Sequence, residues 1–367
     1  MTRKVRRWSA AAVGVALVGG GLIVTRAQAA PDLPARSAEQ LLVDVQSPTT
    51  RTLSGTVQTS TDLGLPALPT TQGTDTSGLT GLLTGDHTVR VWLDGTDRGR
   101  VSLIGNNSET TMVRNGTDVW TYASADRTAS HTTLPAPSSP APTPGTPATP
   151  QQAAQQLLAA VEPSTTVTTT GTARVAGRPV YELVLTPAAR EKTLVRSASV
   201  AIDAQTHVVL QVTVDAVDAT HHAVQVGFSS IDYATPDPKL FTFTAPAGTT
   251  LTEKPAPTGT EPAPTPGGTT GPAPTPGGTT ATAERPKVVG DGWDTVVVQK
   301  VGTLPTGSDT STQTQQAQQM LDALPKVSGS WGSGRLLQGT LFSAVLTDDG
   351  RVAVGAVPAD QLYAALG

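Results

Sequence analysis

The side chains able to perform acid–base or metal chemistry are few in this sequence and poorly spaced for it. There are five histidines and no cysteine, and the one adjacent pair is His221-His222. Neighbouring residues of a strand point to opposite faces, so these two imidazoles cannot chelate one metal ion. We expect both to lie in solvent near a turn, and we expect neither a metal site nor thiolate chemistry.

Motifs for a nucleophile or a bound phosphate are also missing from the sequence. The segment from Gly329 to Gly334 is rich in glycine and serine, yet it lacks the Gly-x-Ser-x-Gly spacing of a hydrolase elbow. The sequence contains no P-loop and no dinucleotide fingerprint, and its carboxylates lie mostly in predicted turns. We therefore predict a protein that binds without catalysing a reaction and that uses no cofactor.

Aromatic side chains on predicted strands are the stronger candidates for a functional surface. Together with one leucine they form the predicted lining of a hydrophobic cavity: Trp92, Leu103, Trp120, Tyr122, Tyr181, Phe228, Phe241 and Phe243. Such residues fill the concave core of a curved sheet, or they contact an apolar ligand held there. In a half-open barrel both interpretations use the same surface.

A long loop between the first two predicted strands, residues 60–87, carries leucines in polar, glycine-rich surroundings. The leucines assigned to it as a flap are Leu65, Leu68, Leu79, Leu82 and Leu83. Loops of this length inside a compact domain are commonly functional or disordered. We keep two interpretations open, a loop packed on the sheet and a flap that covers the mouth of the cavity.

The N-terminus has the three parts of an export signal. Basic residues between Arg3 and Arg7 precede an uncharged, mostly apolar segment from Ala10 to Val24, and Ala27-Gln28-Ala29 is a small-x-small cleavage site. The apolar segment is shorter than the roughly 20 residues that a membrane span needs. We predict that residues 1–29 are a cleaved signal peptide and that the protein is secreted or peripheral to the outer face of the cytoplasmic membrane. An uncleaved anchor is the alternative.

The charge balance argues against nucleic acid as a partner. Removal of residues 1–29 takes away five basic and no acidic residues, which moves the formal net charge from −4 to −9. No basic patch remains in the mature chain.

Two Pro-rich stretches divide the mature chain. The first covers residues 135–147, and the second, residues 255–283, contains a tandem repeat of Pro-Ala-Pro-Thr-Pro-Gly-Gly-Thr-Thr. Such segments bury too little apolar surface to offset chain entropy, so we expect extended spacers. A docking site for a Pro-recognising partner is the alternative.

The residues around the first stretch have the pattern of a β-meander with two inserted helices. Ser37 and Gln40 have the spacing of a capping box, and an apolar stripe follows them. Strands are expected at residues 53–59, 88–93, 100–104, 111–114 and 118–122. A second helix is expected after Thr149, and further strands at 165–175, 178–186, 197–203, 208–215, 224–231 and 240–244. The five early strands are too few for a two-sided core, so we predict one domain over residues 36–254 with the Pro-rich stretch as an insertion.

Residues 287–367 form a separate small α+β domain in this interpretation. A strand is expected at 293–301, a helix at 315–324, a hairpin of 339–346 with 351–357 across Asp348-Asp349-Gly350, and a last helix at 360–366. A unit of this size folds alone only marginally, so docking on the main sheet stays open.

Several segments of the large domain occur in a characteristic order: the opening helix, the run Thr88 to Trp92 with Arg100 to Leu103, the strand Gly116 to Tyr122, the late helix, and Phe241-Thr242-Phe243 with Pro246 and Gly248. Together they resemble the family of LolA lipoprotein carriers and RseB-MucB sigma-factor regulators. The resemblance implies a LolA-like, incomplete antiparallel β-barrel of eleven strands covered by helices. It also implies a hydrophobic cavity and no catalytic activity. The Pro-rich insertion is not typical of the carriers, and the second domain is absent from the simplest of them.

Three functions from different classes remain open on this basis. The resemblance implies a carrier in the cell envelope that holds an acyl chain of a lipid or lipoprotein. It also permits an envelope-stress regulator that binds a membrane anti-sigma factor. The second domain and the linker favour this function. The third is a surface scaffold without any ligand.

Overall fold

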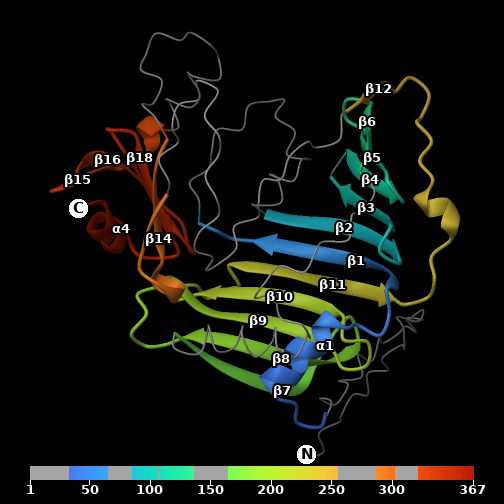
Figure 1. Cartoon of the computed structure of the whole chain (residues 1–367), viewed down its shortest axis with the longest axis horizontal. Coiled ribbons are helices and arrows are strands. Elements are labelled where there is room, and N and C mark those ends of the chain that lie inside the picture. Colours follow the sequence, from blue (N-terminus) through green and yellow to red (C-terminus); the bar gives the residue numbers. More distant parts are fainter. Residues whose placement is uncertain (1–32, 65–84, 106, 136–163, 255–285, 302–320) are drawn as a thin grey trace, which may run out of the picture. The chain divides into compact units, whose positions relative to one another are not determined.

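The computed structural model describes residues 33–64, 85–105, 107–135, 164–254, 286–301 and 321–367 (Figure 1). Within these ranges the chain is mainly β and forms two separate sheets, one large and one small. The predicted signal peptide, the flap leucines, the helix expected after Thr149 and nearly all of both Pro-rich stretches lie outside the described residues. Those expectations stay predictions.

The large sheet contains twelve strands of the described chain in the order β12-β6-β5-β4-β3-β2-β1-β11-β10-β9-β8-β7. The bounds of its first six strands are β1 Thr52–Thr61, β2 Gly85–Asp94, β3 Arg98–Ile104, β4 Glu109–Asn115, β5 Asp118–Ala123 and β6 Thr128–Thr133. The others are β7 Thr165–Val175, β8 Arg178–Pro187, β9 Val195–Asp203, β10 Val209–Ala216, β11 Val224–Asp232 and β12 Thr250–Glu253. Neighbouring strands are antiparallel except β12 and β6, which are parallel.

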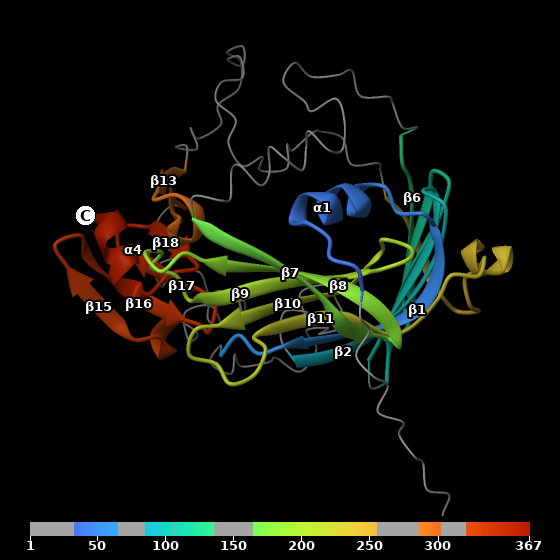
Figure 2. The ribbon, with the colours of Figure 1, turned by 90° about the horizontal axis from the view of Figure 1, so that it is seen from below.

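The sheet is open because its two end strands, β12 and β7, do not pair with each other. Pairing of β1 with β11 joins the strands before residue 135 to those after residue 164. Both halves of the predicted domain therefore belong to one sheet, and the open, mainly antiparallel architecture expected from the sequence is confirmed. Figure 2 shows the β3 to β6 end of the sheet turned up beside α1 (Ala38–Gln46).

Helix α1 forms where the sequence predicts it. The Ser37 side chain accepts a hydrogen bond from the backbone N–H of Gln40, and the Gln40 side chain accepts one from the backbone N–H of Ser37. This capping box satisfies two donors that the first turn would otherwise leave free. The apolar face of helix α1 buries Leu41 against Tyr181 and Ile202.

The small sheet has the order β13-β14-β18-β17-β16-β15 in the described chain. Its elements are β13 Lys287–Val289, β14 Val296–Lys300, β15 Lys326–Gly329, β16 Gly332–Gln338, β17 Ser343–Thr347, β18 Arg351–Gly355 and helix α4 Ala359–Leu366. Helix α4 closes a core of its own, in which Val345, Ala353, Val357 and Leu362 are fully buried. The predicted hairpin at Asp348-Asp349-Gly350 is confirmed as the β17–β18 turn, with Gly350 at φ 82°.

The strand predicted at residues 240–244 is wrong. Pro238–Phe241 is instead a 3-10 helix, η2, because the Asp237 side chain accepts a hydrogen bond from the backbone N–H of Lys239 and Pro238 sets the first turn. Phe241 is buried all the same.

Several further differences follow from local sequence. Trp293 lies in the 3-10 helix η3 (Gly292–Asp294), so the predicted strand at 293–301 shortens to β14. The strands β6, β12, β13, β15 and β16 were not predicted, because their sequences are short, polar or glycine-rich and lack apolar alternation. With β6 and β12 the sheet has one strand more than the eleven that the resemblance implies.

Candidate hydrophobic binding site

One face of the large sheet carries α1, and the strand register shows how far that face extends. Tyr181 contacts α1, and alternation along β8 places Leu183 on the same side. Directly opposed residues of neighbouring antiparallel strands share a face. The line of partners that starts at Leu183 runs through Val200, Val212, Val226 and Thr59.

The same face continues across the other half of the sheet. Val57 precedes Thr59 by two residues and pairs with Val89, and alternation along β2 adds Val91 and Leu93. From Val91 the partners are Val101 on β3 and Met112 on β4. We call this line of residues the apolar stripe: Val57, Val89, Val91, Leu93, Val101, Met112, Val200, Val212 and Val226.

The apolar stripe is incompletely covered by the described residues. The exposed fractions of Leu93, Val101, Met112, Val212 and Val226 lie between 37% and 44%. Single exposed apolar residues are ordinary, whereas a contiguous group on a concave face marks an interaction surface. The stripe therefore provides apolar area for a ligand or partner.

A cleft of about 460 Å³ opens on this face beside the C-terminal end of α1. Its lining is mostly apolar and comes from α1, the start of β1, the end of β2 and the start of β10: Val45, Pro48, Thr50, Arg51, Leu53, Leu93, Gly95, Thr96, His207, Val208 and Val209. Leu93 belongs both to the cleft and to the apolar stripe. The two features are thus continuous.

A buried polar network holds one wall of the cleft. The Asp203 carboxylate, with 0% of its surface exposed, accepts hydrogen bonds from the backbone N–H groups of Gln205 and Thr206 and from the hydroxyl of Tyr233. It also forms an ion pair with Arg178. These bonds fix the turn that leads into His207, Val208 and Val209.

The same network shifts the acidity of its members. Burial opposes ionisation of Asp203, but the hydrogen bonds from Arg178, from the two backbone N–H groups and from Tyr233 outweigh it and hold the pKa of that carboxyl below its usual value. Burial, with the adjacent Asp203 carboxylate, raises the pKa of Tyr233 to about 12. The pair is therefore a carboxylate and a neutral phenol at neutral pH, which is the combination that forms the hydrogen bond.

The structure divides the predicted cavity residues between the two faces of the sheet. Tyr181 and Leu103 lie on the α1 face, since Leu103 pairs with Val89. Phe228 packs on the core around Val180 and Leu210. Trp92 on β2 and the two aromatic residues of β5, Trp120 and Tyr122, lie on the opposite face. Phe241 and Phe243 belong to the segment after β11, which packs against that opposite face.

That opposite face is covered by its own aromatic cluster. Trp120 stacks on His131, with ring centroids 4.2 Å apart, and on Phe243 at 5.1 Å. The Tyr122 ring lies 6.0 Å from Phe243, and η2 contacts β3 and β4. These aromatic side chains hold the segment after β11 against the sheet and leave the apolar stripe on the other side.

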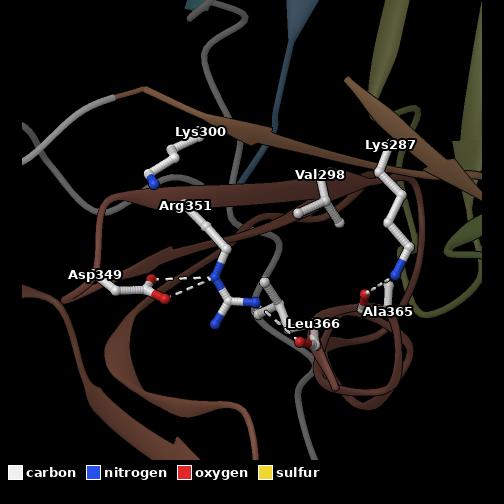
Figure 3. A pocket seen from close by; sticks show the side chains of 7 residues that line it. All are labelled: Lys287, Val298, Lys300, Asp349, Arg351, Ala365 and Leu366. Carbon is white, nitrogen blue, oxygen red and sulfur yellow. Dashed lines mark hydrogen bonds and ion pairs between the residues drawn. The ribbon is translucent and has the colours of Figure 1, made fainter. Parts of the chain in front are cut away.

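The small sheet carries a charged pocket of about 370 Å³ next to the end of α4 (Figure 3). The Arg351 guanidinium donates to the carboxylate of Asp349 at 2.8 Å, to the backbone O of Leu366 at 2.9 Å and to that of Trp331 at 2.9 Å. The Lys287 ammonium donates to the backbone O of Ala365 at 3.5 Å. Cations at this position satisfy the last carbonyls of a helix, so the pocket stabilises α4.

The residues that line the cleft were not singled out from the sequence. A usable signal existed, because Val89, Val91 and Leu93 alternate with Arg90 and Trp92, which marks an apolar face and an opposite face of one strand. The cavity residues predicted from their aromatic type come instead from both faces of the sheet.

The described part of the chain contains neither a cluster of metal-ligating side chains nor a membrane-spanning helix. No group of three or more acidic, histidine or cysteine side chains there is placed to hold a metal ion. None of the described helices has the length and apolar character needed to cross a bilayer.

Comparison with known proteins gives likenesses of structure. No family model and no curated protein matches the chain. A chain of the Pseudomonas aeruginosa MucA/MucB complex is similar at 13% identity and TM-score 0.41, covering 89% of this chain and 95% of that one. A putative outer membrane lipoprotein-sorting protein domain from Vibrio parahaemolyticus is similar at 9% identity and TM-score 0.22, covering 56% and 95%.

A LolA superfamily protein from Nitrosomonas europaea is similar at 11% identity and TM-score 0.20, covering 57% of this chain and 99% of that one. The similar structures thus come from the groups that the sequence resembles. At these identities and TM-scores the likeness concerns the fold and assigns neither ligand nor partner to this chain.

Proposed function

We propose that this chain is an exported, non-enzymatic binding protein of the cell envelope that holds an acyl chain of a lipid or lipoprotein. The observation that carries the proposal is the apolar stripe, which stays partly exposed on the α1 face and runs through Leu93 into the cleft. An acyl chain fits such a surface because it needs apolar contact and no hydrogen-bond partner.

The energetics of this contact favour reversible binding. Each buried CH₂ contributes about 0.8 kcal/mol, so about ten methylenes contribute up to roughly 8 kcal/mol before ordering costs. A dissociation constant in the micromolar range or somewhat weaker follows. Such an affinity suits a carrier that must release its cargo.

The proposal is tested by saturable binding of N-phenyl-1-naphthylamine, a neutral apolar fluorophore, to the purified chain. Leu93→Gln places an amide on the stripe at the cleft, and we expect it to weaken binding about tenfold, equivalent to about 1.4 kcal/mol. Leu251→Gln is the matched control, because Leu251 is also exposed but lies on β12, outside the stripe. Equal loss in both variants, or no saturable binding by the unaltered chain, refutes the proposal.

A regulator that binds a membrane anti-sigma factor is the second candidate. The small sheet with its own buried core favours this regulator function, since holding an acyl chain does not require a second domain. A stoichiometric protein partner that copurifies with the full chain, and is lost with the Leu93→Gln variant, would place a polypeptide on the stripe instead of a lipid.

A further inference from the structure

The rim of the cleft carries an arginine without an opposing charge, which bears on the kind of ligand. Arg51 and Leu53 both line the cleft and are two residues apart at the start of β1. The backbone O of Arg51 accepts a hydrogen bond from the N–H of Gly95 at 3.1 Å, so the base of its side chain is fixed. Within the described residues no carboxylate forms an ion pair with its guanidinium, which is exposed to solvent.

Two nearby carboxylates are engaged elsewhere, and a third, Asp97 after the cleft residue Thr96, forms no ion pair with Arg51 in the described part of the chain. Asp44 of α1 forms an ion pair with Arg36 at 2.5 Å and lies 3.8 Å from the His207 imidazole. Asp94 pairs across strands with Thr52, which alternation places on the face opposite Leu53. Its carboxylate pairs there with Arg98 at 2.8 Å.

We propose that the cleft selects an anionic amphiphile, whose carboxylate or phosphate head group binds Arg51 while its hydrocarbon chain lies on Leu53, Leu93 and Val209. This inference rests on the proposed function and adds the charge of the ligand to it. A guanidinium suits the role because its donors match the oxygens of a carboxylate or phosphate in a bidentate pair. The apolar side chains of Leu53, Leu93 and Val209 line the same cleft as Arg51, so head and chain fit one amphiphile.

The test is displacement of N-phenyl-1-naphthylamine from the full chain at low salt by three ligands with the same alkyl chain. Dodecanoate carries a carboxylate, dodecyl phosphate carries a phosphate, and dodecanol carries no charge. We expect at least one anion to displace the fluorophore at about a tenfold lower concentration than dodecanol, a difference of about 1.4 kcal/mol. Dodecanoate as the stronger competitor assigns a fatty acid, and dodecyl phosphate assigns a phospholipid.

Arg51→Gln should remove that advantage and leave displacement by dodecanol unchanged. Arg98→Gln is the control, because Arg98 lies on the opposite face and already pairs with Asp94. The inference fails, and the proposed function stands, if dodecanol competes as well as both anions or if Arg51→Gln weakens all three ligands alike. Equal loss with Arg98→Gln also overturns it. If none of the three displaces the fluorophore, both the inference and the acyl-chain function are wrong.

Discussion

The Tyr233 hydroxyl donates a hydrogen bond of 3.0 Å to the carboxylate of Asp203. Tyr233 follows β11 directly and Asp203 ends β9, so this bond ties two separate strand ends together. The Thr206 hydroxyl donates to the same phenol oxygen at 2.8 Å, and the backbone O of Thr206 accepts the N–H of Thr49 after α1. The wall of the cleft is thereby connected to the end of the helix beside it.

Replacement of Tyr233 by Phe should destabilise the large sheet. The change leaves Asp203 without one of its donors while it stays buried, which costs about 1–3 kcal/mol. Urea unfolding followed by circular dichroism measures the loss. Tyr363→Phe is a matched control, because Tyr363 stacks on Trp331 and its hydroxyl forms no hydrogen bond with any described residue; a similar loss in both variants would contradict the assignment.

The contact between His131 and β12 should weaken as the pH rises. Hydrogen bonds to Asp118 first, and then to Glu253 against the effect of desolvation, raise the pKa of His131. A raised pKa in the folded state stabilises the protonated form, so this contribution is fully present below about pH 6.5 and is lost as the pH rises through the higher folded value.

Hydrogen exchange of residues 250–253, corrected for intrinsic rates, measures this effect. We expect less protection at pH 8 than at pH 6 in the unaltered chain, and no such difference in His131→Gln. His221→Gln, which changes an exposed histidine away from β12, should keep the dependence. A pH-independent exchange rate in the unaltered chain would rule the histidine contact out.

Helix α1 should fray when its capping box is removed. Ser37→Ala deletes the acceptor for the Gln40 N–H and should cost about 1 kcal/mol. Faster hydrogen exchange in the first turn of α1, with unchanged exchange in α4, is the expected result. Unchanged exchange in α1 would show that packing of Leu41 alone holds the helix.

Burial of Leu41 should stabilise helix α1 more than the capping box does. Only 1% of this side chain is exposed, between Tyr181 and Ile202, and Leu→Ala at such sites costs about 2–5 kcal/mol. The neighbouring Leu42 is only half-buried, so Leu42→Ala should cost clearly less in the same urea titration. The reverse order would contradict the packing described for α1.

Local sequence was sufficient for the features that depend on neighbours in the chain. Ser37 and Gln40 are three residues apart and form the cap by themselves. Asn115-Gly116 forms the turn between β4 and β5, with Gly116 at φ 63°, a conformation that glycine adopts without strain. The strand at residues 240–244 failed because the alternation of Phe241 and Phe243 outweighed the turn signal of Asp237-Pro238.

The candidate site depends on contacts between distant residues, which is why the sequence did not predict it. Arg51 and Val209 meet in the cleft because β1 pairs with β11 and β11 with β10. Trp120 and Leu103 lie on opposite faces through the register of β3, β4 and β5. A single list of large apolar residues contains no information on that register.

Native mass spectrometry of the full chain purified from its own host envelope tests the central claim most directly. We expect a copurifying lipid or lipopeptide in a 1:1 complex, whose occupancy falls in Leu93→Gln and persists in Leu251→Gln. A chain that carries no added mass and yields no saturable binding of any of the lipids tested would contradict it.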